Sequence, residues 1–111
     1  MPLKLKAADA IDIVAGRAAE AASTLKAMAS ETRLMILCAL SSGELPVNRL
    51  AEITNQSQST VSQHLSKLRA AGLVDSRRDG QTIYYRSLDG IARDVIDTLC
   101  QHYTDEPPAR G

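Results

Sequence analysis

The chain has 111 residues, of which 44% are hydrophobic and 23% are charged, with 13 basic and 13 acidic side chains. That length predicts a single domain, and this composition is typical of a soluble globular protein. No stretch approaches the ~20 apolar residues that a membrane helix needs. Acidic residues also interrupt the N-terminal stretch where a signal peptide would be apolar. We therefore expect a cytoplasmic protein with no membrane partner.

The formal net charge is zero, but the charges are unevenly distributed. Residues 61–86 carry five Lys or Arg and two Asp or Glu, a balance of +3. Residues 87–111 carry two basic and five acidic residues, a balance of −3. A basic segment fits either a nucleic-acid contact or an ordinary solvated face, so the surrounding elements must decide between the two.

The first predicted helix spans residues 18–28, AAEAASTLKAM, which are rich in helix-forming residue types. Its small and apolar side chains recur at helical spacing: Ala18, Ala21, Ala22, Leu25 and Met28. Ser30 then starts a second helix, in which residues 34–40 are continuously apolar. We expect this to be a buried core helix that ends at residues 41–43, Ser-Ser-Gly.

Two short helices are predicted next, over residues 47–54 and 57–71. Pro46 is suited to open the former, because the first turn of a helix needs no amide hydrogen. Asn55 is suited to end that helix in the left-handed conformation, and Ser57 is suited to cap the start of the latter. The short connection between them predicts a helix-turn-helix.

The second of these helices has a distinctive polar face. Val61, Leu65 and Leu68 cluster in a narrow arc, which predicts the core face. The opposite face and its flanks carry short polar side chains and one lysine: Ser59, Thr60, Ser62, Gln63, Ser66 and Lys67. A merely solvated face more often uses Glu and Lys, which have higher helix propensity. Ser, Thr and Gln instead offer hydrogen-bond donors and acceptors to base edges.

The following segment predicts a β-hairpin with strands at residues 74–78 and 82–86, joined at the pair Asp79-Gly80. A hairpin directly after a helix-turn-helix is a wing, and Arg77 and Arg78 lie near its tip, within reach of phosphates. The prediction is a mainly α protein with a small β-hairpin, a DNA-binding winged helix-turn-helix domain over residues 1–111. Residues 1–17 are expected to form an N-terminal extension and residues 105–111 a disordered tail.

Three blocks in this order resemble the ArsR/SmtB family of small bacterial winged-helix repressors: SETRLMILCALSSGEL, STVSQHLSKLRAAGLV and RRDGQTIYYR. The resemblance covers residues 18–103 and implies a homodimer, joined by its first and last helices, on an inverted-repeat operator in double-stranded DNA. The last helix supports the dimer independently, because its apolar stripe needs a partner surface: Ile91, Val95, Leu99 and Tyr103.

The family's base contacts map onto the start of the polar helix, where His64 also fits a partly buried structural histidine. Together with the lysine and the two wing arginines, the predicted DNA contacts are Gln58, Ser59, Thr60, Ser62, Gln63, His64, Lys67, Arg77 and Arg78.

Two metal sites of the family are altered in this chain. Arsenic sensors carry a cysteine pair in an ELCVCDL box, where this chain has ELPVNRL. A zinc site on the last helix would need four ligands, and Ile91 supplies none in the register of Asp89, Ile91, His102 and Asp105. We therefore expect no bound metal and no cofactor.

Cys38 and Cys100 allow two interpretations. Both are compatible with small buried side chains, and in a cytoplasmic chain they are more often free thiols than a structural bridge. The likeness to a family branch that senses sulfane sulfur or oxidants instead makes them sensor thiols, although Cys100 lies one helical turn (~5.4 Å) before the family's position.

The expected function is a homodimeric repressor that is derepressed by thiol modification, through persulfide, polysulfide or an oxidant. The alternatives are an ArsR-type regulator without a thiol or metal inducer and a weakly zinc-responsive repressor. The sequence contains no phosphate-binding glycine loop and no His-Glu-x-x-His motif, so we do not expect an enzyme.

Overall fold

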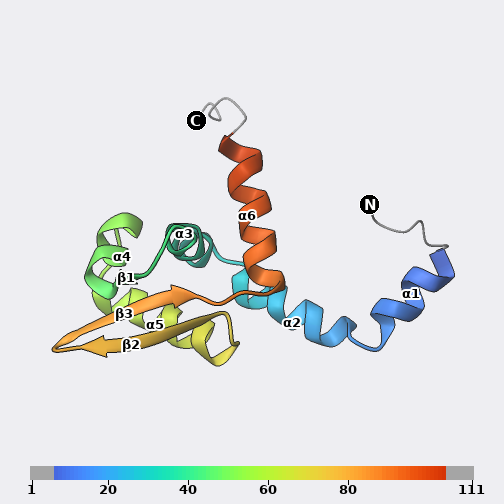
Figure 1. Ribbon diagram of the computed structural model, residues 1–111, viewed down its shortest axis with the longest axis horizontal. Coiled ribbons are helices and arrows are strands. Elements are labelled where there is room, and N and C mark those ends of the chain that lie inside the picture. The colour runs from blue at the N-terminus through green and yellow to red at the C-terminus, as the bar shows by residue number, and fades with distance from the viewer. Residues whose placement is uncertain (1–6, 105–111) are drawn as a thin grey trace.

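The computed structural model describes residues 7–104, which form six helices and three strands (Figure 1). In chain order the elements are α1 (Ala7–Ala15), α2 (Ala18–Met28), α3 (Glu31–Leu40), β1 (Leu45–Pro46), α4 (Val47–Thr54), α5 (Gln58–Ala70), β2 (Val74–Asp79), β3 (Thr82–Ser87) and α6 (Ile91–Thr104). This order confirms the predicted winged helix-turn-helix. None of the helices in the described part is long and apolar enough to cross a bilayer.

The core is formed where α3, α4, α5 and β2 meet. Its fully buried large side chains are Ile36, Leu40, Leu50, Val61, Leu65, Leu68 and Val74. The three from α5 are the predicted core face, and each contributes about 1.5–3 kcal/mol by leaving water. Burial of this face fixes the rotation of α5, so its polar face is directed outward.

Local capping interactions set the helix-turn-helix connection. Asn55 adopts the left-handed conformation with φ 55°. Its N–H donates to the carbonyl of Glu52, and the N–H of Gln56 donates to the carbonyl of Ala51, a Schellman arrangement. The Ser57 Oγ accepts from the Thr60 N–H at 3.0 Å and caps α5. Backbone hydrogen bonds therefore hold this turn, and the Gln56 side chain within it is exposed.

The wing has one strand more than the sequence predicted. β1 pairs antiparallel with β3, giving the strand order β1-β3-β2. Pro46 therefore lies in an edge strand and at the N-cap of α4, directly before the predicted helix, as its missing N–H permits. At the hairpin tip Asp79 pairs with Thr82. Gly80, with φ 65°, is the first of the two turn residues, as a type II′ turn requires.

The predicted extension contains a helix, and one expectation about the N-terminal half, that α3 is a buried core helix, was wrong. Residues 7–15 of the predicted extension form α1, which buries none of its side chains and lies apart from the wing (Figure 1). Helix α3 is buried on one face only: Ile36 is fully buried, whereas Met35 is 38% exposed, because α4 and α5 cover a single side of it. The tail predicted at residues 105–111 lies outside the described residues.

Candidate DNA-binding surface and cysteine pair

The outer face of α5 presents most of the side chains that the sequence predicted as DNA contacts. The exposed ones are Gln58, Ser59, Ser62, Gln63 and Lys67, beside Ser66. Thr60 is half-buried, and its Oγ1 accepts a hydrogen bond from the Ser57 hydroxyl at 2.9 Å. The surface is therefore a row of short uncharged donors and acceptors with one cation at its C-terminal half.

His64 differs from its neighbours on α5. It is half-buried, and its Nδ1 accepts a hydrogen bond from the Arg33 Nε of α3 at 3.1 Å. Arg33 also donates from Nη1 to the Ala27 carbonyl at the end of α2, at 3.1 Å. Burial, then the charges of Arg33 and Lys67, lowers the pKa of His64 below its ordinary value of 6.5. His64 is therefore neutral at pH 7.

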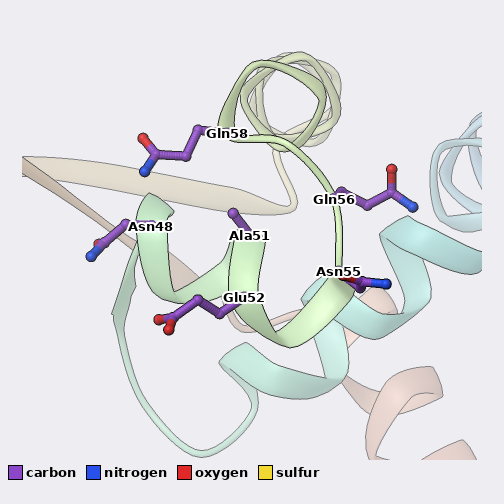
Figure 2. A pocket seen from close by; sticks show the side chains of 6 residues that line it. All are labelled: Asn48, Ala51, Glu52, Asn55, Gln56 and Gln58. Carbon is purple, nitrogen blue, oxygen red and sulfur yellow. The ribbon is translucent and has the colours of Figure 1, made fainter.

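A shallow depression of about 500 Å³ lies at the helix-turn-helix connection (Figure 2). In Figure 2 the amides of Gln56 and Gln58 extend in opposite directions from the turn. Five of its six lining residues have polar side chains, and the lining residues are Asn48, Ala51, Glu52, Asn55, Gln56 and Gln58. The side chains around the turn therefore continue the polar surface of α5 toward α4, where Glu52 adds a carboxylate.

The two wing arginines have different surroundings. The Arg77 Nε donates to both carboxylate oxygens of Glu44, at 3.1 and 3.0 Å, and its Nη2 also donates to Glu44. The Arg77 guanidinium additionally lies 4.7 Å from the centroid of the Tyr84 ring. The hydrogen bond from Arg77 holds the pKa of the Glu44 carboxyl below its ordinary value. Arg77 is thus anchored to the α3–β1 loop.

Arg78 faces the other side of the hairpin, because neighbouring residues of a strand alternate. It is exposed, and within residues 7–104 it makes no ion pair. On the hairpin face that carries Arg77, the basic side chains are paired with carboxylates: Arg86 pairs with Asp75 at 3.7 Å and Arg77 with Asp79 at 3.9 Å. Arg78 is therefore the wing cation that is available to an external anion.

Cys38 and Cys100 are brought together although 62 positions separate them in the chain. They form a disulfide between α3 and α6, with their Cα atoms 6.7 Å apart. The one-turn displacement of Cys100 thus leaves the pair within the roughly 7 Å that a direct bond requires. The expectation of two free thiols is not what the structure contains.

The cysteine pair lies at the surface, in a mostly apolar groove of about 350 Å³. The groove is lined by Leu34, Met35, Cys38, Ile96, Leu99, Cys100 and Tyr103. Cys38 is exposed and Cys100 half-buried, which corrects the interpretation of Cys38 as a core side chain. The buried stripe of α3 contains Ile36, Leu37 and Leu40, and Cys38 lies on the other side of the helix. A dissolved reactant can therefore reach this pair.

The residues in the zinc register of α6 have other contacts. Asp89 pairs with Arg93 at 3.9 Å, and the His102 ring packs edge-on against Tyr103. Asp105 lies outside the described residues. No group of three or more possible metal ligands gathers anywhere in residues 7–104.

Apolar side chains remain exposed on the helices predicted to join two subunits. In α6, Ile91 and Tyr103 are 67% and 69% exposed, while Ala92 and Ile96 face the core. The corresponding exposed side chains of α1 and α2 are Ile11, Ile13, Val14 and Leu25. These apolar side chains are therefore not covered by the rest of residues 7–104.

The helix-turn-helix, the outward polar helix and the cationic wing define a winged helix-turn-helix DNA-binding protein. Residues 30–76 match the family described as bacterial regulatory protein, arsR family. Nodulation protein NolR of Rhizobium meliloti is 47% identical over 89 residues, which are 80% of this chain and 73% of NolR. The chain belongs to the ArsR family and is a DNA-binding transcriptional regulator.

Solved structures agree with this assignment. Reduced HlyU from Vibrio cholerae superposes with a TM-score of 0.77 at 41% identity, over 81% of this chain and 95% of HlyU. A homodimeric winged helix-turn-helix DNA-binding domain from Mycobacterium bovis superposes with a TM-score of 0.69 at 34% identity, over 82% of this chain and 83% of that domain.

Sequence reasoning missed two residues of this surface, Arg33 and Glu44. Both act on predicted site residues from distant parts of the chain, over sequence separations of 31 and 33. Neither belongs to a local motif, so no periodicity or spacing in the sequence connects them to the polar helix or the wing.

Proposed function

We propose that this chain is a homodimeric cytoplasmic repressor that binds an inverted-repeat operator and releases it when Cys38 and Cys100 become covalently linked. The observation that carries the proposal is the position of the pair, which joins α3 to α6 at an accessible groove. Helix α3 packs on α4 and α5, the helices of the DNA-binding unit, whereas α6 carries the exposed apolar stripe.

The DNA-binding half of the proposal uses α5 in the major groove and the wing beside it. In a symmetric dimer two copies of α5 meet successive major grooves, which requires an operator with two-fold symmetry. The amide and hydroxyl groups of Gln58, Ser59, Ser62 and Gln63 supply donors and acceptors for base edges. Lys67 and Arg78 supply positive charge for phosphates.

The dimer in this proposal buries the uncovered apolar face of α1, α2 and α6. A second copy of this chain is the partner that we propose for this apolar surface, because the homodimeric Mycobacterium bovis domain shares this fold. Replacing Leu25 or Ile91 by glutamate is expected to shift sedimentation from dimer to monomer, since each is more than half exposed in the single chain and would become a buried charge in the dimer. Variants that stay fully dimeric would contradict this interface.

The thiol chemistry requires an oxidant from solution. Hydrogen peroxide removes two electrons and two protons from the two thiols, so that one S–S bond forms and the peroxide becomes two molecules of water. An inorganic polysulfide donates one sulfane sulfur to a thiolate; the other thiolate then attacks the inner sulfur of that persulfide and releases hydrosulfide. The reducing cytoplasm keeps both thiols reduced in the absence of such a signal.

Closing the link has a calculable effect on stability. A loop of about 60 residues loses roughly 4 kcal/mol of chain entropy in the unfolded state. Regulation additionally requires that the linked form favour a geometry of α3 and α6 that binds operator less well. Residues of both α3 and α6 line the groove beside the pair, and a difference in how these two helices pack would arise there.

The test is operator binding by the reduced wild type, Cys38→Ser and Cys100→Ser, each before and after polysulfide or peroxide. The probe is a duplex enriched by the reduced wild type from a randomised pool. We expect release by the wild type alone, with mass spectrometry showing the loss of two hydrogens that accompanies the S–S bond. Equal release by all three proteins, or by none, means that these cysteines are not the switch and that the regulator responds elsewhere.

A further inference from the structure

Arg33, in the first turn of α3, joins two helices through one guanidinium. Its Nη1 donates to the Ala27 carbonyl at the end of α2, and its Nε donates to the His64 Nδ1 of α5, both at 3.1 Å. Arg33 itself is fixed by the N-cap, where its backbone N–H donates to the Ser30 Oγ. The Arg33 side chain therefore holds the imidazole ring of His64, on α5, against the capped N-terminus of α3.

The hydrogen bond from Arg33 determines where His64 carries its proton. An imidazole nitrogen that accepts a hydrogen bond has a free lone pair, so neutral His64 is protonated on Nε2. Protonation of Nδ1 would remove the acceptor and place a second cation beside Arg33, with Lys67 nearby on the same helix. Arg33 thus selects one tautomer and one ring orientation.

The Nε2–H of His64 is accessible and has no partner within the described chain. Residues 7–104 contain no fully buried side-chain nitrogen or oxygen that lacks a hydrogen bond, and Nε2 forms none of the hydrogen bonds within that range. Nε2 is therefore in contact with solvent. The two ring nitrogens face different directions, so this donor points away from Arg33.

We propose that Arg33 is a positioning residue for DNA binding, which holds His64 so that its Nε2–H donates to an acceptor of the duplex. His64 lies next to Gln63 in the middle of the outward helix, and DNA presents acceptors both on base edges and on phosphates. The inference rests on DNA binding through α5 and is independent of the cysteine pair.

Two matched substitutions of His64 test the contributions of its Nδ1 acceptor and its Nε2 donor separately. In His64→Asn the amide oxygen lies near the position of Nδ1 and still accepts from Arg33, but the distal donor is missing. In His64→Gln the amide nitrogen lies near the position of Nε2 and restores that donor. Against the duplex enriched by the wild type, we expect about a tenfold loss of affinity for His64→Asn and a smaller loss for His64→Gln, which restores the distal donor but no longer accepts from Arg33 at the Nδ1 position.

A scrambled duplex of the same composition distinguishes the source of the acceptor. A loss confined to the enriched duplex assigns a base edge, and a loss on both duplexes assigns a phosphate. Equal affinities of the Asn and Gln variants, whether high or low, would overturn the proposal, because the distal donor would then have no effect.

Nitrogen-15 spectra of the histidine rings give a readout that does not depend on substituting His64. The chain has two histidines, so a His102→Gln variant assigns the signals. We expect a protonated Nε2 and an unprotonated Nδ1 in the free protein, and a shifted Nε2 signal in the DNA complex. Arg33→Met should mix the tautomers and weaken DNA binding, with little further effect in the His64→Asn background. A proton on Nδ1, or an Nε2 signal unchanged by DNA, would contradict the assignment.

Discussion

Replacing Arg78 by alanine is predicted to reduce the salt dependence of DNA binding more than replacing Arg77. Each phosphate contact contributes about 0.9 to the slope of log affinity against log salt. A symmetric dimer loses two such contacts, so the slope should fall by roughly 1.8. Between about 50 and 200 mM salt, the wild type should therefore lose about tenfold more affinity than Arg78→Ala. Arg77→Ala should change the slope less, because Glu44 already neutralises that guanidinium.

Fluorescence anisotropy over a series of KCl concentrations measures these slopes on the enriched and the scrambled duplex. Both duplexes should respond alike, since a phosphate contact carries no sequence information. Arg17→Ala is a matched control, because Arg17 is an exposed arginine at the N-cap of α2 that pairs with Glu20. An unchanged slope for Arg78→Ala, or a larger effect for Arg77→Ala, would refute the assignment of Arg78 as the wing contact.

Further outcomes follow from α5. Gln63→Ala should relax base preference by roughly 1–3 kcal/mol at one position per half-site; equal weakening on all sequences would argue against base contact. Ser57→Ala should lower the free energy of unfolding by about 1 kcal/mol in urea denaturation, and no change would mean that the cap adds no stability. Unfolding free energy should also fall as pH drops below 6.5, because the lowered pKa of His64 makes the folded chain bind fewer protons than the unfolded chain. His64→Gln should show a smaller fall, and an identical pH profile would contradict this.

The sequence by itself determined the DNA-binding unit, because its signals are local. Capping residues and helical periodicity act within a few positions of the chain. Ser30, Asn55 and Ser57 therefore marked helix ends that the structure reproduces. The core face of α5 could likewise be predicted, since residues on one helix face recur at fixed spacing.

Only the tertiary structure decided which side chains meet across the chain. The strand β1 exists because Leu45 and Pro46 find β3 as a partner, and two residues carry no periodicity that would predict it. The helix α1 buries nothing in the single chain, so no core-facing pattern marked it.

Contacts between distant parts of the chain also decide the surroundings of the wing arginines and the cysteine pair. Arg77 and Arg78 are neighbours of the same type, and their difference comes from Glu44, 33 positions away from Arg77. Cys38 lies in an apolar segment, yet it is exposed because α4 and α5 cover the other side of α3. Its distance from Cys100 depends on the packing of α6 across 62 residues. Spacing in a sequence specifies the face of one helix, whereas contacts between helices are specified only by the packing of the whole chain.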